Sequence, residues 1–284
     1  MPKSTYCYYK ETKHIKAKTK RQNKDNEILD VVKPIYEQNK KRYGYRRIIL
    51  AIDNDILKSL NAGRDRICKV LRANGLLGIQ GNNQKYHSYK GDNGFDKKNL
   101  LLSKELINGK EKLVRHFETT KSNQKWTTDV SEFKITYGKL YLSPIMDMHD
   151  SSIVSYDISK SPNLEQTRRM LTSAFTKNKA LNGLIFHSDQ GWQYQHRTYM
   201  KELKSRNIRQ SFSRKGNCMD NSPMENFFGI MKNEMFYGHE DEFKSLDNLR
   251  KAMEDYITYY NTKRINIKRQ GLSPLEYRQK SLSL

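Results

Sequence analysis

The chain has 284 residues, enough for one large domain or two smaller ones. Its 53 Lys and Arg residues outnumber its 31 Asp and Glu residues, and the formal charge of +22 indicates a polyanionic partner. Nucleic acid fits this charge better than an anionic membrane surface or solubility alone, because the basic residues are spread along the whole chain among 18 Tyr residues.

The sequence contains no run of about 18 apolar residues and no apolar segment near its first residue, so we expect neither a transmembrane helix nor a signal peptide. The three cysteines, Cys7, Cys68 and Cys218, are far apart and match no disulfide framework or zinc motif. These features predict a protein of a reducing cytoplasm that does not enter a membrane.

Residues 1–24 carry eight Lys or Arg residues and one Glu, which predicts an exposed basic arm. Contact with phosphates and a merely solvated tail fit this arm equally well. Residues 80–124 are rich in Gly, Asn and Lys and are expected to form a basic linker.

Residues 25–79 follow the helix period and predict a small helical domain. Pro34 should kink or end its first helix, Asn61 should cap the third helix, and Gly75 should stop it. Arg46 and Arg47 belong to a set of basic residues outside the apolar stripes. Three short helices with such a surface are typical of a helix-turn-helix-like DNA-binding module, although three-helix units have many uses.

Residues 125–284 predict an α/β domain with the order β-β-β-α-β-α-β, followed by helices. WTTDVSEF and ITYGKLYLSPIMDM predict a hairpin, in which Pro144 should cause a bulge or a lost ladder bond. SIVSYDI, LIFHSD and IRQSF predict the remaining strands of a mixed five-stranded sheet with flanking helices. A further amphipathic helix is expected after Ser245.

Three acids stand out on this map. Asp129 lies in the first strand, Asp189 ends the fourth at the carboxyl edge of the sheet, and Glu225 lies near a helix start. Clustered carboxylates need cations, and oxygen donors without Cys or His favour Mg²⁺ or Mn²⁺. Two such ions activate a nucleophile and stabilise the leaving oxygen of a phosphodiester. In a basic chain, this pattern indicates phosphoryl transfer on nucleic acid.

The pattern resembles the DDE transposase and retroviral-integrase superfamily and, within it, the OrfB-type transposases of the insertion sequence 3 family. The stretches that carry the resemblance are WTTDVSEF, HSDQGWQY, SRKGNCMDNSPMENFF and YYNTKRINIKRQGLSPLEY, with YGYRRI and RANGLLG in the preceding helical region. It extends over nearly all of residues 25–280, and 35 residues separate the second and third acids. It implies an RNase H-like integrase catalytic core in residues 125–284, with C-terminal helices.

The resemblance implies that Asp129, Asp189 and Glu225 are the catalytic acids and the ligands of two Mg²⁺ or Mn²⁺ ions. It also implies that Lys232, two helical turns beyond Glu225 on the same face, contacts DNA near the scissile phosphate. Further DNA contacts are expected from the loop before this helix and from the helical domain: Arg214, Lys215, Arg46 and Arg47.

The family activity that this implies is cleavage and joining of the ends of the element itself. Water attacks a phosphodiester and releases a 3′-OH, which then attacks a second phosphodiester in line, without a covalent protein–DNA intermediate. The implied partners are DNA with terminal inverted repeats, target DNA, an upstream OrfA-type helix-turn-helix and leucine-zipper protein or its frameshift fusion, and further copies of the chain. The implied location is the bacterial cytoplasm, at the nucleoid when the protein is on DNA.

Several acids also have simpler interpretations. Ser222-Pro223-Met224-Glu225 is by itself a good capping box, which would make Glu225 a structural residue. Asp220 is expected to be a loop or cap acid, and Glu234 should face away from Glu225. Asp147 and Asp150 have the positions of turn acids.

His187, Ser188 and Asp189 contain the residue types of a hydrolase triad, but consecutive strand residues cannot converge as one. His187 is therefore expected to pack in the core or to support the neighbouring acid. Three other classes remain open: a nuclease of the same fold that does not join DNA, an inactive DNA-binding regulator from a decayed element, and a zinc-dependent integrase. The last lacks its N-terminal His/Cys site in this sequence.

Overall fold

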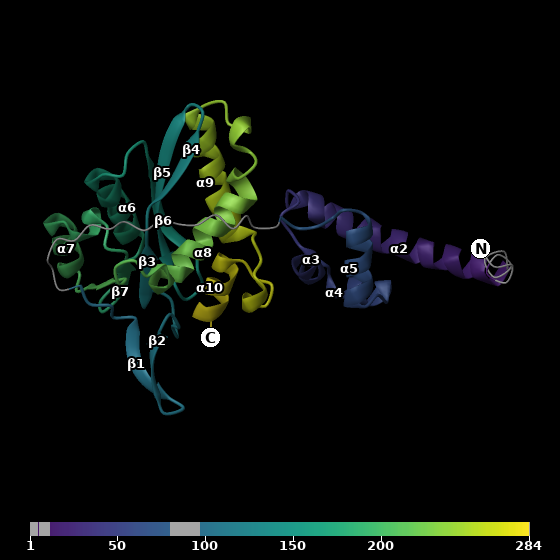
Figure 1. Ribbon diagram of the computed structural model, residues 1–284, viewed down its shortest axis with the longest axis horizontal. Coiled ribbons are helices and arrows are strands. Elements are labelled where there is room, and N and C mark those ends of the chain that lie inside the picture. Colours follow the sequence, from purple (N-terminus) through teal and green to yellow (C-terminus); the bar gives the residue numbers. More distant parts are fainter. Residues whose placement is uncertain (1–4, 6–11, 80–96, 284) are drawn as a thin grey trace. The chain divides into compact units, whose positions relative to one another are not determined.

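The computed structural model describes residue 5, residues 12–79 and residues 97–283 (Figure 1). It forms two compact units: one comprises Met1–Gln80 with Asn266–Gly271, and the other comprises Gly81–Ile265 with Leu272–Leu284. Most of the first half of the predicted arm 1–24, together with Cys7, lies outside the described residues, as do residues 80–96 of the predicted linker. No described helix is long and apolar enough to cross a membrane.

The N-terminal unit is helical, with α2 (Thr12–Gln38), α3 (Tyr45–Ala51), α4 (Asn54–Leu60) and α5 (Arg64–Ala73). The predicted apolar stripes supply its core, in which these side chains are buried: Ile28, Val32, Tyr36, Tyr43, Ile48, Ile52, Leu60, Ile67, Val70 and Leu71. The rest of the predicted arm belongs to α2, so the basic segment is part of a long helix rather than a separate tail.

Pro34 does not end its helix: α2 continues to Gln38. Only one turn remains beyond the proline, and Tyr36, buried in the core, holds that turn in place. The expectation for Asn61 is wrong. Asn61 does not cap the third helix: it ends α4 in a left-handed conformation (φ 40°), and Gly63 precedes α5. Gly75 has a positive φ of 67° directly after α5 and its C-cap, as the stop signal predicts.

The predicted linker contains a β-hairpin that the composition concealed. Strands β1 (Leu102–Ile107) and β2 (Lys110–Arg115) pair in an antiparallel ladder. The turn residues Asn108 and Gly109 both have positive φ, 54° and 72°, as in a type I′ turn. The Asn-Gly pair was the available signal, and the many lysines around it masked the alternation.

The second unit is built on a mixed sheet whose strands are β3 (Lys125–Thr128), β4 (Ser131–Ile135), β5 (Gly138–Asp147), β6 (Ile153–Ser159), β7 (Ile185–Ser188) and β8 (Arg209–Phe212). β5 pairs antiparallel with β3, β4 and β6, and β7 lies parallel between β3 and β8. Apart from the division of the first strand, the order of strands and helices along the chain is the predicted one. The sheet has six strands instead of five, because the first predicted strand is divided into β3 and β4.

β3 and β4 both pair with β5, and the break between them lies along this shared partner. Ser131 of β4 pairs with Leu142 of β5, and Thr128 of β3 pairs with Ile145, so Asp129 and Val130 lie in the gap. Pro144 stands in β5 opposite this gap and pairs with Tyr156 of β6 on its other side. The register of β5 against β6 shifts between Ile145 and Met146, one residue beyond Pro144, so the ladder is irregular next to the proline.

Helices cover both faces of the sheet (Figure 1). α6 (Leu164–Lys177) and α7 (Arg197–Lys204) share one core with Trp126 and Phe186. α8 (Ser222–Met231) and α9 (Leu246–Thr262) form a second core with β4 and β5 on the opposite face. The last helix is α10 (Pro274–Leu282). Since each face is closed by its own helices, polar chemistry is left to the strand ends.

Candidate active site

Asp129 and Asp189 lie at equivalent positions of two neighbouring parallel strands. Thr127 of β3 is in register with His187 of β7, and each aspartate is two residues further along its strand. Each is therefore the first residue after its strand ends. The sheet brings the two acids to the same edge, as the sequence predicts for neighbouring strands.

Local backbone bonds orient both carboxylates. Asp129, with a relative exposure of 5%, accepts a hydrogen bond from the N–H of Val130 at 2.7 Å. Asp189 accepts one from the N–H of Gly191 at 2.9 Å. A Cβ on Gly191 would stand 2.7 Å from the side-chain nitrogen of Gln193 and 3.0 Å from Oδ1 of Asp189, so a larger residue here would displace the Gln193 side chain and press on the Asp189 carboxylate. Burial raises the pKa of Asp189, and the Gly191 bond opposes that shift.

Tyr194 is a buried residue near the acids that was not singled out from the sequence. It belongs to the short 3₁₀ helix η1 (Trp192–Gln195) and is fully buried. Burial raises the pKa of the Tyr194 hydroxyl, and the charges of Asp189 and Asp129 raise it further. Because both charges act on one phenol, the two carboxylates are close to the same buried group. The motif HSDQGWQY contained this residue.

Glu225 lies in the first turn of α8 and is half-buried. The expected capping box at Ser222 is wrong: Asn221 is the N-cap, and Ser222 is already helical (φ −54°, ψ −30°). The reason is the 3₁₀ turn η2 (Cys218–Asn221), which leads directly into the helix. The Asn221 side chain bonds to the end of β3 instead of to α8.

Lys232 is the next helical residue after α8 and begins a single π turn, η3 (Lys232–Phe236). Its helical backbone keeps it on the face of Glu225, as expected. Its ammonium nitrogen is 5.1 Å from the ring centroid of Phe133. Burial lowers the pKa of Lys232, whereas the charge of Asp129 raises it, so this cation is close to the first acid.

Asp220 is a structural acid with two arginine partners. Its carboxylate is fully buried and accepts bonds from Arg214 at 2.8 Å and from Arg115 at 2.9 Å. Burial raises the pKa of Asp220, but the bonds from Arg214 and Arg115 outweigh it and hold the pKa well below its usual value. Arg214 is thus engaged within the loop, whereas Lys215 is exposed.

Glu234 is not a ligand candidate either. It is buried on η3 and pairs with the equally buried Arg264 at 2.7 Å, and it accepts a bond from the Tyr256 hydroxyl at 2.9 Å. His187 is buried, and its ring nitrogens lie 2.8 Å and 3.0 Å from the hydroxyls of Ser211 and Ser213. Burial lowers the pKa of His187 to about 4, so it is neutral near pH 7 and supports the fold.

In the N-terminal unit, the expected DNA contacts lie at the start of α3. Arg46 is exposed, and its Nε donates to the hydroxyl of Tyr45 at 3.0 Å. Arg64 donates to the same hydroxyl at 2.8 Å. Arg47 is half-buried, with its guanidinium carbon 5.7 Å from the ring centroid of Tyr43. The structure therefore places Arg46 and Arg64 together around one tyrosine.

The donor set at the strand ends suits a hard divalent ion. Within the described residues, no three His, Cys, Asp or Glu side chains lie close enough together to hold a metal. Mg²⁺ is nonetheless commonly bound by one or two carboxylates together with water and substrate phosphates. Asp129 and Asp189 supply two such ligands at one edge, and a cation there would relieve the cost of burying Asp189.

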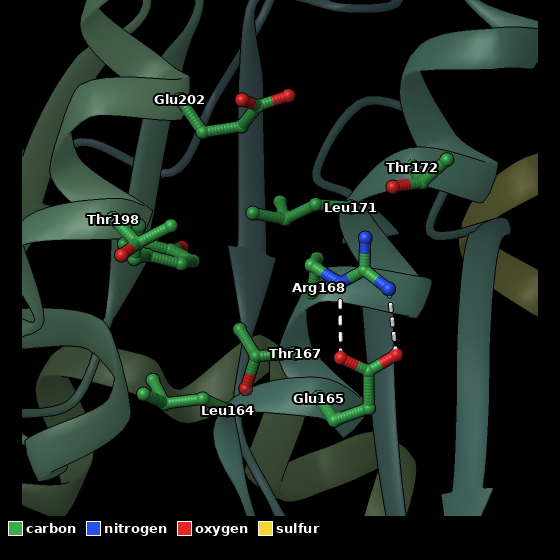
Figure 2. A pocket seen from close by; sticks show the side chains of 9 residues that line it. Leu164, Glu165, Thr167, Arg168, Leu171, Thr172, Thr198 and Glu202 are labelled. Carbon is green, nitrogen blue, oxygen red and sulfur yellow. Dashed lines mark hydrogen bonds and ion pairs between the residues drawn. The ribbon is translucent and has the colours of Figure 1, made fainter.

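A pocket of about 270 Å³ lies elsewhere, between α6 and α7 (Figure 2). Leu164, Leu171 and Tyr199 give it apolar walls, and Arg168 holds Glu165 with two bonds of 2.9 Å and 2.8 Å at its rim. None of the candidate acids lines it. The pocket is therefore separate from the chemistry at the strand ends.

Comparison with known proteins defines the class. Residues 119–218 and 225–282 match two models described as integrase core domain, and residues 23–84 match an HTH-like domain. The integrase catalytic core domain of HTLV-2 in complex with magnesium aligns with a TM-score of 0.43 and 19% identity, over 56% of this chain and 97% of that one.

The chain is 37% identical to a protein named as the transposase InsK of insertion sequence element IS150 in Escherichia coli, over 99% of this chain and 91% of that protein. It is 45% identical to a transposase-like protein of Haemophilus influenzae, over 76% and 94% of the two chains. A transposase of insertion sequence element IS904 in Lactococcus lactis is 30% identical, over 90% and 96%. The chain belongs to the insertion sequence 3 family of transposases, so it is a DNA transposase and a polynucleotidyl transferase.

Proposed function

We propose that this transposase cuts and joins the ends of its own insertion sequence by divalent-metal-dependent transesterification, with Asp129, Asp189 and Glu225 as the catalytic metal ligands. The observation that supports this most is the register of β3 and β7, which brings Asp129 and Asp189 to one edge. Glu225 would join these two acids from α8, whose start is bonded to β3.

The three acids would hold two Mg²⁺ or Mn²⁺ ions. Bound there, the ions supply the positive charge that favours a nucleophilic oxygen and a leaving oxygen on phosphorus. The protein's part is to hold the carboxylates in place, since the backbone bonds to Asp129 and Asp189 fix their orientation. A water is the nucleophile in the first step, and the released 3′-OH is the nucleophile in the second.

DNA contacts are assigned by charge and position. Lys232 lies near Asp129 and is partly desolvated, which strengthens its attraction to a phosphate. Lys215 is the exposed cation of the loop before α8, and Arg214 beside it is positioned by Asp220. In the N-terminal unit, Arg46 and Arg47 would contact the terminal repeats.

The partners belong to the same proposal. We expect the terminal inverted repeats and the target DNA as substrates, and an assembly of several copies on the paired ends. An upstream helix-turn-helix and leucine-zipper protein, or a fusion with it, would assist in finding the repeats. Light scattering of the protein with and without terminal-repeat DNA tests the assembly, and a monomer on paired ends would contradict it.

The test of the chemistry is an assay of the purified protein on terminal-repeat DNA with Mg²⁺. Asp129→Asn, Asp189→Asn and Glu225→Gln should each abolish strand transfer while DNA binding is retained. Full activity in any of the three would remove that residue from the site. Hydrolysis without joining in the unaltered protein would instead indicate a nuclease, and binding without either reaction would indicate an inactive regulator.

A further inference from the structure

We propose that Asn221 is a positioning residue of the active site, which fixes the start of α8, and with it Glu225, against the strand end that carries Asp129. The inference rests on the proposed function of the two acids. It deepens that proposal by naming the group that sets their relative position.

The contacts of Asn221 are unusual for a helix N-cap. An N-cap asparagine normally accepts a bond from the second or third N–H of its own helix, as Asn163 does at α6 from the N–H of Gln166 at 2.9 Å. Asn221 makes no such bond. Its Oδ1 accepts from the hydroxyl of Thr127, and its Nδ2 donates to the carbonyl of Thr128 at 3.1 Å.

The two bonds join elements that are distant in the sequence but adjacent in the site. Asp129 follows Thr128 directly, and Glu225 lies four residues beyond Asn221, which is about one helical turn. Asn221 therefore links the chain segments that carry two of the proposed ligands. A small rotation of α8 about this point would move the Glu225 carboxylate relative to Asp129.

Burial makes this connection rigid. Asn221 has a relative exposure of 3%, and Thr127 and Thr128 are fully buried. Loss of one partner would leave a buried polar atom unsatisfied, which disfavours any sliding of α8 along β3. Asp220, one residue earlier, is held by Arg214 and Arg115, so the η2 turn is fixed on both sides.

The experiment compares Asn221→Ala with Asn261→Ala, because the Asn261 amide makes a similar pair of bonds elsewhere. It bonds the carbonyl and the N–H of Ile153, each at 2.9 Å, and so joins α9 to β6 away from the acids. Both variants should lower the Tm without metal. Only Asn221→Ala should raise the Mg²⁺ concentration for half-maximal strand transfer, by about 10- to 100-fold, and reduce the Mg²⁺-induced increase in Tm.

Conservative variants separate positioning from folding. Thr127→Val removes one of the two bonds and should show a smaller shift in the same direction, whereas Thr127→Ser keeps the hydroxyl and should retain normal Mg²⁺ dependence. These two also serve if Asn221→Ala does not fold. Unchanged Mg²⁺ dependence in Asn221→Ala and Thr127→Val would overturn the inference. No Mg²⁺-induced Tm increase and no strand transfer in the unaltered protein would overturn the proposed function itself.

Discussion

Helices α8 and α10 begin with the same four-residue pattern, Ser-Pro-x-Glu, but the two starts differ in structure. In α10, Ser273 is extended (φ −71°, ψ 164°) and caps the helix, and the Glu276 carboxylate accepts from the N–H of Ser273 at 2.8 Å. In α8, Ser222 is already helical and Asn221 holds the cap position. Glu225 is thus the fourth helical residue, one position beyond that of a capping-box glutamate.

The surroundings explain the difference. A capping serine needs an extended backbone, which Ser273 has and which η2 denies to Ser222. Asn221 is bonded to β3, so the place at which α8 begins is set by a tertiary contact. The same local pattern therefore gives a structural glutamate in one helix and a candidate ligand in the other.

The largest expected effect comes from making the same change in both glutamates. Glu225→Gln should reduce strand transfer by about 10²-fold or more, because it removes the charge of a proposed metal ligand, with little change in stability. Glu276→Gln should retain activity and stability within about 0.5 kcal/mol, since glutamine also serves in a capping box. Strand-transfer rates and urea unfolding measure both. Equal losses of activity would show that the two helix starts do not differ in function.

The second effect concerns how α10 is held to the sheet. Arg278 of α10 pairs with Asp147 and, at 2.7 Å, with Asp150, and both carboxylates are fully buried. Asp147 and Asp150, which were expected to be turn acids, therefore anchor α10 to the sheet through Arg278. Arg278→Ala should lower the free energy of unfolding by about 3–5 kcal/mol, because it leaves two buried charges without their cation.

Arg278→Lys is the matched control for this anchor. It keeps the charge but loses the planar fork that serves two carboxylates, so it should show part of the loss. Mg²⁺ dependence should change in neither variant. A shift in Mg²⁺ affinity comparable to that expected for Asn221→Ala would mean that α10 also positions the ligands.

Acid should act in opposite directions on buried His187 of β7 and on Asp147, which holds α10 through Arg278. Unfolded His187 gains a proton below its usual pKa of 6.5, whereas buried His187 does so near 4, so the free energy of unfolding falls across this window by up to about 3 kcal/mol. Burial and the charge of Asp150 raise the pKa of Asp147, so folded Asp147 gains its proton before the unfolded chain does. Protonation of Asp147 at acid pH therefore stabilises the folded state relative to the unfolded chain.

Hydrogen exchange between pH 7 and 4.5 measures this contrast. Amides of β7 and β8, next to His187, should lose protection before those of α10. His187→Gln should remove most of the pH dependence in β7 and β8, because no group with a lowered pKa remains at that position. Earlier loss of protection in α10 would contradict the opposite effects expected at His187 and Asp147.

Most of the fold could be predicted from the sequence, because periodicity and β-branched runs specify single elements. The order of the strands along the chain, the apolar stripes of α5 and α9 and the edge position of Asp189 all follow from such patterns. Asp129 was expected within the first strand, and the break after Thr128 places it at a strand end instead. Tertiary bonds could not be predicted in this way. The roles of Asn221 and Tyr194 and the arginine partners of Asp220 depend on residues far apart in the chain.

The smallest effect tests the two helix starts directly. Ser273→Ala should lower the free energy of unfolding by about 1 kcal/mol, because it removes the hydroxyl that accepts from the N–H of Glu276 at 3.4 Å. Ser222→Ala should cost only a few tenths of that amount, since a residue inside the first turn has no capping role and alanine suits a helix. Urea unfolding of the two variants measures the difference. An equal loss would mean that Ser222 caps α8 in solution. Glu225 would then be the glutamate of a capping box, as its local sequence predicts.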